Sequence, residues 1–310
     1  MIQCSPLRPK RLRVGDLVAL VAPAGATRQQ QADTAARVVA GWGLRVRLGR
    51  HALGRHTYLA GTDEERLADL NDALRDPEVR GVICLRGGYG SQRIVDDVDY
   101  AAVRADPKLV MGFSDITALH VALWCEAGLA TVHGPTGANL NPSAESMTNR
   151  AAERAVMTAD PAIVVPDPAQ TTAGVRVAGR VEGTILGGNV TMLAATAGTR
   201  HKPEMTGKIL LIEAVSEQTY RLDRSLVQLK RSGWFDGLAG VAVGQFTDCD
   251  EEIPGPTVPE ILLDHFGALG IPVLGGLPIG HGDQQTAIAL GVPAILDADA
   301  STLTVQPIGR

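Results

Sequence analysis

The chain has 310 residues, of which 45% are hydrophobic and 20% charged, a composition typical of globular proteins that excludes disordered and fibrous classes. Its formal net charge of −5 gives no basic excess, so neither nucleic acid nor an anionic membrane surface is expected as the main partner. The length suits two domains better than one large one, and small molecules are the expected ligands.

Targeting and redox features of the sequence favour the cytoplasm. No secretory signal is expected, because Asp16 interrupts the basic N-terminus before the apolar run 17–22. The longest apolar runs are strand-sized, well short of the roughly 20 residues that a membrane-spanning helix needs. Cysteines are scattered without a CxxC pair, as expected for reduced thiols, and we predict neither a metal nor a cofactor.

The first half of the chain alternates short apolar runs with amphipathic segments, the pattern of a parallel sheet covered by helices. Thr62 and Glu65 have the spacing of a capping box, which predicts the start of a helix. We expect strands over 17–21, 44–48, 81–85, 109–112 and 130–133, and helices over 27–42, 62–74, a short segment ending at 95, and a segment beginning near 115.

A domain boundary is expected where residues 160–174 lose periodicity and gain Pro, Asp and Thr. The prediction is an N-terminal α/β domain over 1–160, a linker over 161–174, and a smaller, β-rich, barrel-like α/β domain over 175–310. Strands are expected there at 175–181, 208–212, 240–245, 273–277, 286–290 and 303–305, with helices near 222–230 and 258–266.

The sharpest local feature is Ser114, which stands at an abrupt change from strand to helix. Such a turn projects the hydroxyl from the carboxyl edge of the sheet, and the following backbone N–H groups point to the same place. Ser114 is therefore a candidate nucleophile. The alternative is that Ser114 only caps the helix. Ile116 replaces the second glycine of the hydrolase elbow G-x-S-x-G, which disfavours a plain α/β-hydrolase.

A glycine-rich turn, 86–90, follows the preceding strand. Glycines there let the backbone approach a ligand, so the turn could cradle a phosphate or lend an N–H to an oxyanion hole. Because both turns follow neighbouring parallel strands, Gly88 is expected beside Ser114 at one edge of the sheet.

A serine nucleophile needs a base and an acid that orients the base. His281 lies between glycines in a loop, which leaves its ring open to a cleft, and His133, at the end of a strand, is the second choice. Glu213 ends a buried apolar run and is the preferred acid, whereas Glu217 stands at a helix approach, where carboxylates are usually solvated caps.

Together, these stretches resemble the LD-carboxypeptidase family of serine peptidases, which includes microcin-immunity peptidases. The resemblance implies a flavodoxin-like N-terminal domain carrying the serine, a β-rich C-terminal domain supplying Glu and His, and a homodimer. The motifs that carry it span nearly the whole chain and are 86–90, 112–117, 133–135, 186–189, 211–213 and 280–282.

The resemblance also implies roles for individual residues. The triad falls on Ser114, Glu213 and His281, with oxyanion donors from the backbone of Gly88 and Asp115. The implied reaction is release of the terminal D-alanine from a cytoplasmic murein tetrapeptide during cell-wall recycling. Whether the third peptide residue is lysine or diaminopimelate stays open.

Recognition of a free C-terminal carboxylate needs a cation or N–H groups, and Arg86 is the candidate, with a structural ion pair as the alternative. The chain departs from the family at Ala214, where Asp often follows the catalytic Glu, and at Leu186, in place of a frequent Trp. Both departures bear on the substrate pocket.

Other functions remain open on the sequence alone. One alternative is an immunity-type serine peptidase that cleaves a peptide-nucleotide antibiotic or an acyl-sulfamoyl adenylate. Another is a non-catalytic protein that binds a nucleotide or sugar phosphate, although no Walker motif or full G-x-G-x-x-G is present. Metal-dependent hydrolysis is disfavoured because no HExxH or dense His/Asp cluster occurs.

Overall fold

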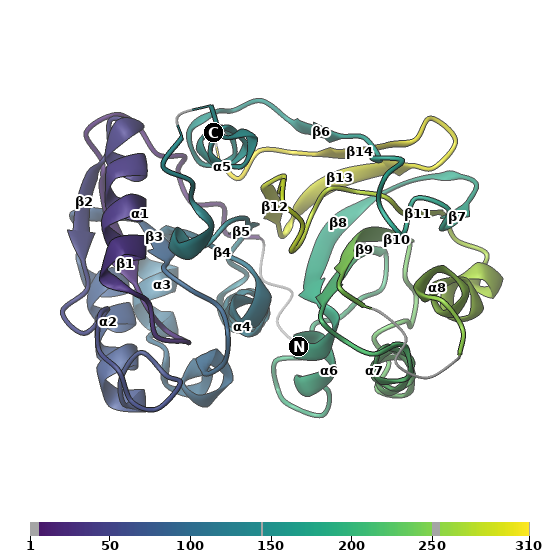
Figure 1. Cartoon of the computed structure of the whole chain (residues 1–310), viewed down its shortest axis with the longest axis horizontal. Coiled ribbons are helices and arrows are strands. Elements are labelled where there is room, and N and C mark those ends of the chain that lie inside the picture. Colours follow the sequence, from purple (N-terminus) through teal and green to yellow (C-terminus); the bar gives the residue numbers. More distant parts are fainter. Residues whose placement is uncertain (1–5, 144, 250–254, 310) are drawn as a thin grey trace. The chain divides into compact units, whose positions relative to one another are not determined.

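The computed structural model describes residues 6–143, 145–249 and 255–309 (Figure 1). Contacts divide the chain into two compact units. The N-terminal unit runs to Asp160 and includes 287–289 and 307 onward, and the C-terminal unit comprises 161–286 and 290–306. Within the described ranges, no helix is both long enough and apolar enough to cross a bilayer.

The N-terminal unit is built on a sheet with the strand order β12-β5-β4-β3-β1-β2. β1 to β5 pair in parallel, which confirms the α/β class predicted for this half of the chain. Parallel strands covered on both faces read as continuous apolar runs, and β1 and β4 are buried at every position. The strands are β1 Leu17–Val21, β2 Arg45–Leu48, β3 Val79–Cys84, β4 Leu109–Gly112, β5 Thr131–His133 and β12 Ile288–Leu290.

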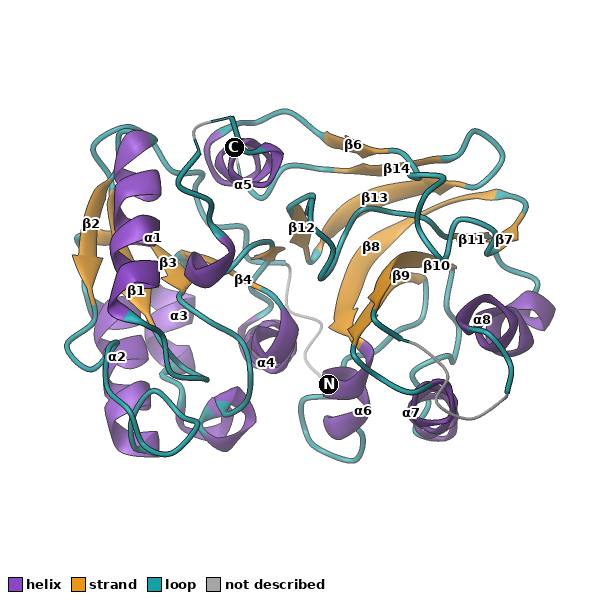
Figure 2. Cartoon of the chain, in the orientation of Figure 1, coloured by secondary structure: helices purple, strands orange, loops and turns teal. Residues whose placement is uncertain are grey.

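Helices flank this sheet (Figure 2). The predicted capping box forms: the Thr62 hydroxyl accepts from Glu65 N at 3.3 Å, and the Glu65 carboxylate accepts from Thr62 N at 2.9 Å. α1 begins two residues after the expected cap, Thr27, because Arg28 is its N-cap. α3 and α5 were not predicted, and the short helix expected to end at 95 is a pair of 3₁₀ turns, Ser91–Arg93 and Val95–Asp97. The helices are α1 Gln29–Gly41, α2 Asp63–Arg75, α3 Tyr100–Ala105, α4 Thr117–Ala127 and α5 Met147–Met157.

The C-terminal unit has a mixed sheet with the order β6-β14-β13-β8-β9-β10-β11-β7. β8 to β11 pair in parallel, and the outer strands pair antiparallel. The sheet curls on itself: a Cβ on Gly240 of β10 would lie 3.0 Å from side chains of Val181 and Leu296, on strands that do not neighbour β10. The strands are β6 Ala162–Val164, β7 Arg176–Val177, β8 Arg180–Asn189, β9 Lys208–Val215, β10 Gly240–Thr247, β11 Val273–Leu274, β13 Val292–Asp297 and β14 Thr302–Val305.

Several elements differ from those expected. The expected linker contains β6, which pairs with β14. The single strand expected over 175–181 is two strands, because Gly179 adopts φ 127°, a conformation that a strand does not continue through. The strand expected over 286–290 is β12, which lies next to β5 in the first sheet. The helices of the C-terminal unit are α6 Val190–Ala195, α7 Thr219–Arg231 and α8 Val258–Phe266.

Candidate active site

Ser114 lies on a strained turn between β4 and α4. Its φ is 63°, in the left-handed region that residues other than glycine rarely adopt and that clusters at functional sites. A 3₁₀ turn, Ser114–Ile116, follows at once and leads into α4. The N-cap of α4 is Ile116, without a side-chain hydrogen bond, so Ser114 does not act as the cap of this helix.

The glycine-rich turn after β3 contacts the serine through Gly87. A Cβ on Gly87 would lie 2.8 Å from Ser114 Cβ, 3.1 Å from Ser114 Oγ and 3.4 Å from the Asp115 nitrogen. Since real Cβ atoms do not approach other atoms as closely as 2.8 Å, only glycine fits there without a shift of the chain. The sequence pointed to Gly88 as a neighbour of the serine, and Gly88 follows directly after Gly87 with φ 95°.

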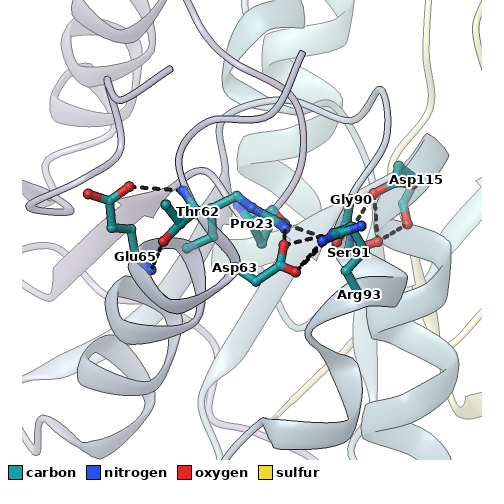
Figure 3. Close-up of polar contacts among 9 residues, drawn as sticks. Pro23, Thr62, Asp63, Glu65, Gly90, Ser91, Arg93 and Asp115 are labelled. Atoms are coloured by element: carbon teal, nitrogen blue, oxygen red, sulfur yellow. Dashed lines mark hydrogen bonds and ion pairs between the residues drawn. The ribbon is translucent and has the colours of Figure 1, made fainter. Parts of the chain in front are cut away.

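The Asp115 side chain ties the two turns together (Figure 3). Its Oδ2 accepts from Ser91 N at 2.8 Å, and the Ser91 hydroxyl lies 2.6 Å from both Oδ2 and the Asp115 carbonyl oxygen. Both residues are 1% exposed. Asp115 was predicted to act only through its backbone N–H. The side-chain contact was not predicted, because it joins residues 24 positions apart.

Arg66 holds the same glycine-rich turn through Gly90. Its guanidinium is 1% exposed and donates to the carbonyl oxygens of Gly90, at 2.9 Å, and of Pro23, and to the Asp63 carboxylate. Hydrogen bonds from Arg93 and Arg66 hold the pKa of Asp63 below its ordinary value. A buried cation needs such partners, so Arg66 fixes the segment that ends at Gly90.

The C-terminal unit brings together the predicted acid and base. His281 Nδ1 lies 2.6 Å from Glu213 Oε2. The Glu213 side chain is 0% exposed and that of His281 is 15% exposed. A carboxylate only accepts hydrogen bonds, so Nδ1–H is the donor, and the lone pair of the neutral ring is on Nε2, where a general base needs it.

A bulge in β10 shapes the loop that carries His281. The register between β9 and β10 shifts between Val243 and Phe246, beside Glu213. Gln245 N then donates to Ile279 O at 2.9 Å, and its side chain accepts from Gly282 N at 2.8 Å. Gln245 is 1% exposed, and its two hydrogen bonds hold the loop at a residue before His281 and at the residue after it. Gln245 was not predicted as a site residue, because its only signal in the sequence is a polar residue inside the apolar run of β10.

The other candidates have distinct surroundings. His133 is buried at the end of β5, and the centroid of its ring lies 5.9 Å from that of the Phe113 ring. His120, which was not singled out as a base, donates from Nε2 to Gly112 O at 2.8 Å, and burial lowers its pKa to about 4. Glu217 accepts from Thr191 Oγ1 at 2.8 Å. Arg86 is exposed and donates to Ala26 O at 2.6 Å. It forms no ion pair among the described residues, which was the alternative role considered for it.

No group of three or more His, Cys, Asp or Glu side chains able to hold a metal occurs within the described ranges. Ser114 belongs to the N-terminal unit, and Glu213 and His281 belong to the C-terminal unit.

Two family models match the chain: the LD-carboxypeptidase N-terminal domain over 18–134 and the LD-carboxypeptidase C-terminal domain over 182–296. A carboxypeptidase homologue of Streptomyces coelicolor is 43% identical over 308 residues, which cover 97% of this chain and 96% of that protein. The murein tetrapeptide carboxypeptidase of Pseudomonas aeruginosa is 36% identical over 291 residues, 91% of this chain and 93% of that one.

Solved structures agree with this assignment. The muramoyltetrapeptide carboxypeptidase of Oxalobacter formigenes superposes with a TM-score of 0.83 at 29% identity, covering 95% of this chain and 100% of its own. The microcin C7 self-immunity protein MccF shares the fold, with a TM-score of 0.87 at 22% identity over 97% of this chain and 98% of its own. These likenesses confirm the α/β fold. The family models and the murein tetrapeptide carboxypeptidase relative show an enzyme, which excludes the non-catalytic alternative. The chain belongs to the LD-carboxypeptidase family and is a serine carboxypeptidase.

Proposed function

We propose that this enzyme releases the terminal D-alanine from murein tetrapeptide, with Ser114 as nucleophile, His281 as general base and Glu213 as the acid that orients it. The observation that carries the proposal is the 2.6 Å contact between His281 Nδ1 and the fully buried Glu213 carboxylate. The strained turn at Ser114 and the name of the Pseudomonas aeruginosa relative support the same assignment.

In the proposed reaction, His281 Nε2 takes the hydroxyl proton of Ser114 as its oxygen attacks the carbonyl carbon of the amide before D-alanine. The N–H groups of Gly88 and Asp115 hold the tetrahedral oxyanion, an effect worth about 3 kcal/mol per donor in comparable enzymes. His281 returns the proton to the leaving amine as the C–N bond breaks, leaving an acyl-enzyme. A water molecule, deprotonated by the same imidazole, releases the shortened peptide and restores Ser114.

We further propose that the protein acts in the cytoplasm during cell-wall recycling and does so as a homodimer. In this proposal residues 1–160 form the domain that carries the nucleophile, 161–174 connect the two, and 175–310 supply Glu213 and His281. Arg86 is the proposed partner of the free carboxylate, because it is exposed at the start of the glycine-rich turn.

The test is mass spectrometry of murein tetrapeptide incubated with the wild type, with Ser114→Ala, and with Ser143→Ala as an exposed serine control in the same unit. The wild type and Ser143→Ala should release D-alanine, while Ser114→Ala should release none above the uncatalysed background. Equal release by all three proteins would remove Ser114 from the mechanism.

A second candidate substrate is an aminoacyl nucleotide analogue, favoured by the structural likeness to MccF, one of whose structures contains aspartyl sulfamoyl adenosine. The proposed chemistry at Ser114 would be the same. Comparing kcat/KM for murein tetrapeptide with that for aspartyl sulfamoyl adenosine decides between the two, and the preferred proposal expects the tetrapeptide to be the better substrate.

A further inference from the structure

A pocket of about 330 Å³ in the N-terminal unit is lined by Arg86 and by residues to which the proposed reaction assigns no role. Its walls come from the loops that follow β1 and β2 and from Arg86, which follows β3. Because β1, β2, β3 and β4 run parallel, these loops and the Ser114 turn all lie at the carboxyl edge of one sheet. In such sheets this edge is where ligands bind.

Contacts link the pocket step by step to the nucleophile turn. Gly25 N, on the loop after β1, donates to Gly87 O at 2.9 Å. Gly87 is the residue whose Cβ would collide with Ser114. On the pocket side, the Arg86 guanidinium donates to Ala26 O at 2.6 Å and lines the pocket. The pocket therefore adjoins the turn that packs on Ser114.

The pocket is cationic in a chain whose net charge is −5. Arg28, Arg55 and Arg86 line it and are exposed, and none of the described residues that line it is an Asp or Glu. Within the described ranges these three guanidiniums form no ion pair. Their charges are left uncompensated by the protein, which is the arrangement that an anionic ligand requires.

One further feature of the pocket favours an anion. α1 begins at Gln29, directly after the pocket residue Arg28, and has no acidic residue in its first turn to offset the positive end of the helix.

We propose that this pocket, defined by Thr27, Arg28, Arg55 and Arg86, binds a carboxylate of the peptide substrate. The inference rests on the proposed function and makes it more specific, since murein tetrapeptide has carboxylates in two places. One is the terminal carboxylate of D-alanine, and the other lies within the peptide, on γ-linked D-glutamate or on a diaminopimelate side chain. Guanidinium groups match the planar, forked geometry of a carboxylate.

The experiment measures tetrapeptide binding by titration calorimetry in the Ser114→Ala background, where no turnover occurs. Arg28→Ala and Arg55→Ala are compared with Arg37→Ala, which removes an exposed arginine of α1 outside the pocket. We expect each pocket variant to raise Kd about tenfold, in the range of one charge-assisted contact near the surface, and Arg37→Ala to leave it unchanged.

Modified peptides then identify the carboxylate. If the pocket holds the terminal carboxylate, a tetrapeptide C-terminal amide should bind about tenfold more weakly to the parent and be insensitive to Arg55→Ala. If it holds an internal carboxylate, this insensitivity should appear instead with D-isoglutamine in place of D-isoglutamate, or with lysine in place of diaminopimelate.

The pocket proposal and the proposed function fail in different ways. Absence of tetrapeptide turnover by the wild type contradicts the function, while a tenfold loss of binding in Arg55→Ala would still support the pocket. Equal Kd values for Arg28→Ala, Arg55→Ala and Arg37→Ala, or no measurable binding of the peptide to the Ser114→Ala parent, would overturn the pocket even if the wild type cleaves the peptide.

Discussion

At the scale of single residues, the contact between Glu213 and His281 carries the largest expected catalytic effect. Glu213→Gln preserves side-chain volume but replaces the acceptor with a group that favours the wrong imidazole tautomer. We expect kcat for murein tetrapeptide to fall by about 10²- to 10⁴-fold with KM little changed. Steady-state kinetics check this, and a kcat within threefold of the wild type would contradict the role of Glu213.

Ser91 tests whether the Asp115 contact positions the nucleophile turn. Ser91→Ala removes the hydroxyl that lies 2.6 Å from Asp115 Oδ2 and leaves a buried carboxylate with one donor fewer. We expect the free energy of unfolding to fall by about 1–3 kcal/mol and kcat to fall about tenfold. Urea unfolding and kinetics of Ser91→Ala are compared with those of Ser143→Ala. Loss of stability with kcat unchanged would show a purely structural role.

At the scale of elements, the close approach of two turns depends on the absence of a side chain at Gly87. Gly87→Ala places a Cβ 2.8 Å from Ser114 Cβ, so the turn or the serine has to move. Because a misplacement of about 1 Å can cost 10²-fold in rate, we expect at least that loss of kcat.

The matched control for Gly87→Ala is Gly41→Ala in α1. A Cβ on Gly41 meets nothing within 4 Å and its φ is not in the left-handed region, so activity should be unchanged and stability equal or raised by about 0.4–1 kcal/mol. Similar activity in the two variants would contradict the argument from Gly87.

The local sequence pattern predicted most helices and strands, but it did not predict which distant segments pair with one another. The apolar runs of β1, β3, β4 and β5 and the capping box at Thr62 are signals within a few residues, and the structure has these elements. β12 joins the first sheet from far along the chain, and nothing near 288–290 encodes its neighbour.

In the candidate site, Ser114, Glu213 and His281 have motif signals. Ser91, Arg66 and Gln245 act through contacts 24 to 43 positions away, which a single sequence does not reveal.

At the scale of the whole molecule, acid should weaken the fold through His120. Burial lowers its folded-state pKa from 6.5 to about 4, so the unfolded chain binds this proton first as the pH falls. His120 therefore has no effect on the free energy of unfolding above pH 6.5. As the pH falls from 6.5 to 4, its protonation lowers the free energy of unfolding by up to about 3 kcal/mol.

Urea unfolding across that pH range measures this loss in the wild type, in His120→Gln and in His56→Gln, which changes an exposed histidine of the same unit. The slope of unfolding free energy against pH should shrink in His120→Gln and persist in His56→Gln. Identical slopes in all three proteins would show that His120 is not responsible.

The account depends most on one relation: Ser114 of the N-terminal unit is activated by His281 of the C-terminal unit. Labelling by a serine-reactive fluorophosphonate, followed by peptide mass spectrometry, tests this without a choice of peptide substrate. We predict that the wild type is labelled at Ser114 and that His281→Ala slows labelling by at least about 10²-fold, the lower range for a general base. Labelling at another residue, or at the same rate without His281, would contradict the proposed mechanism.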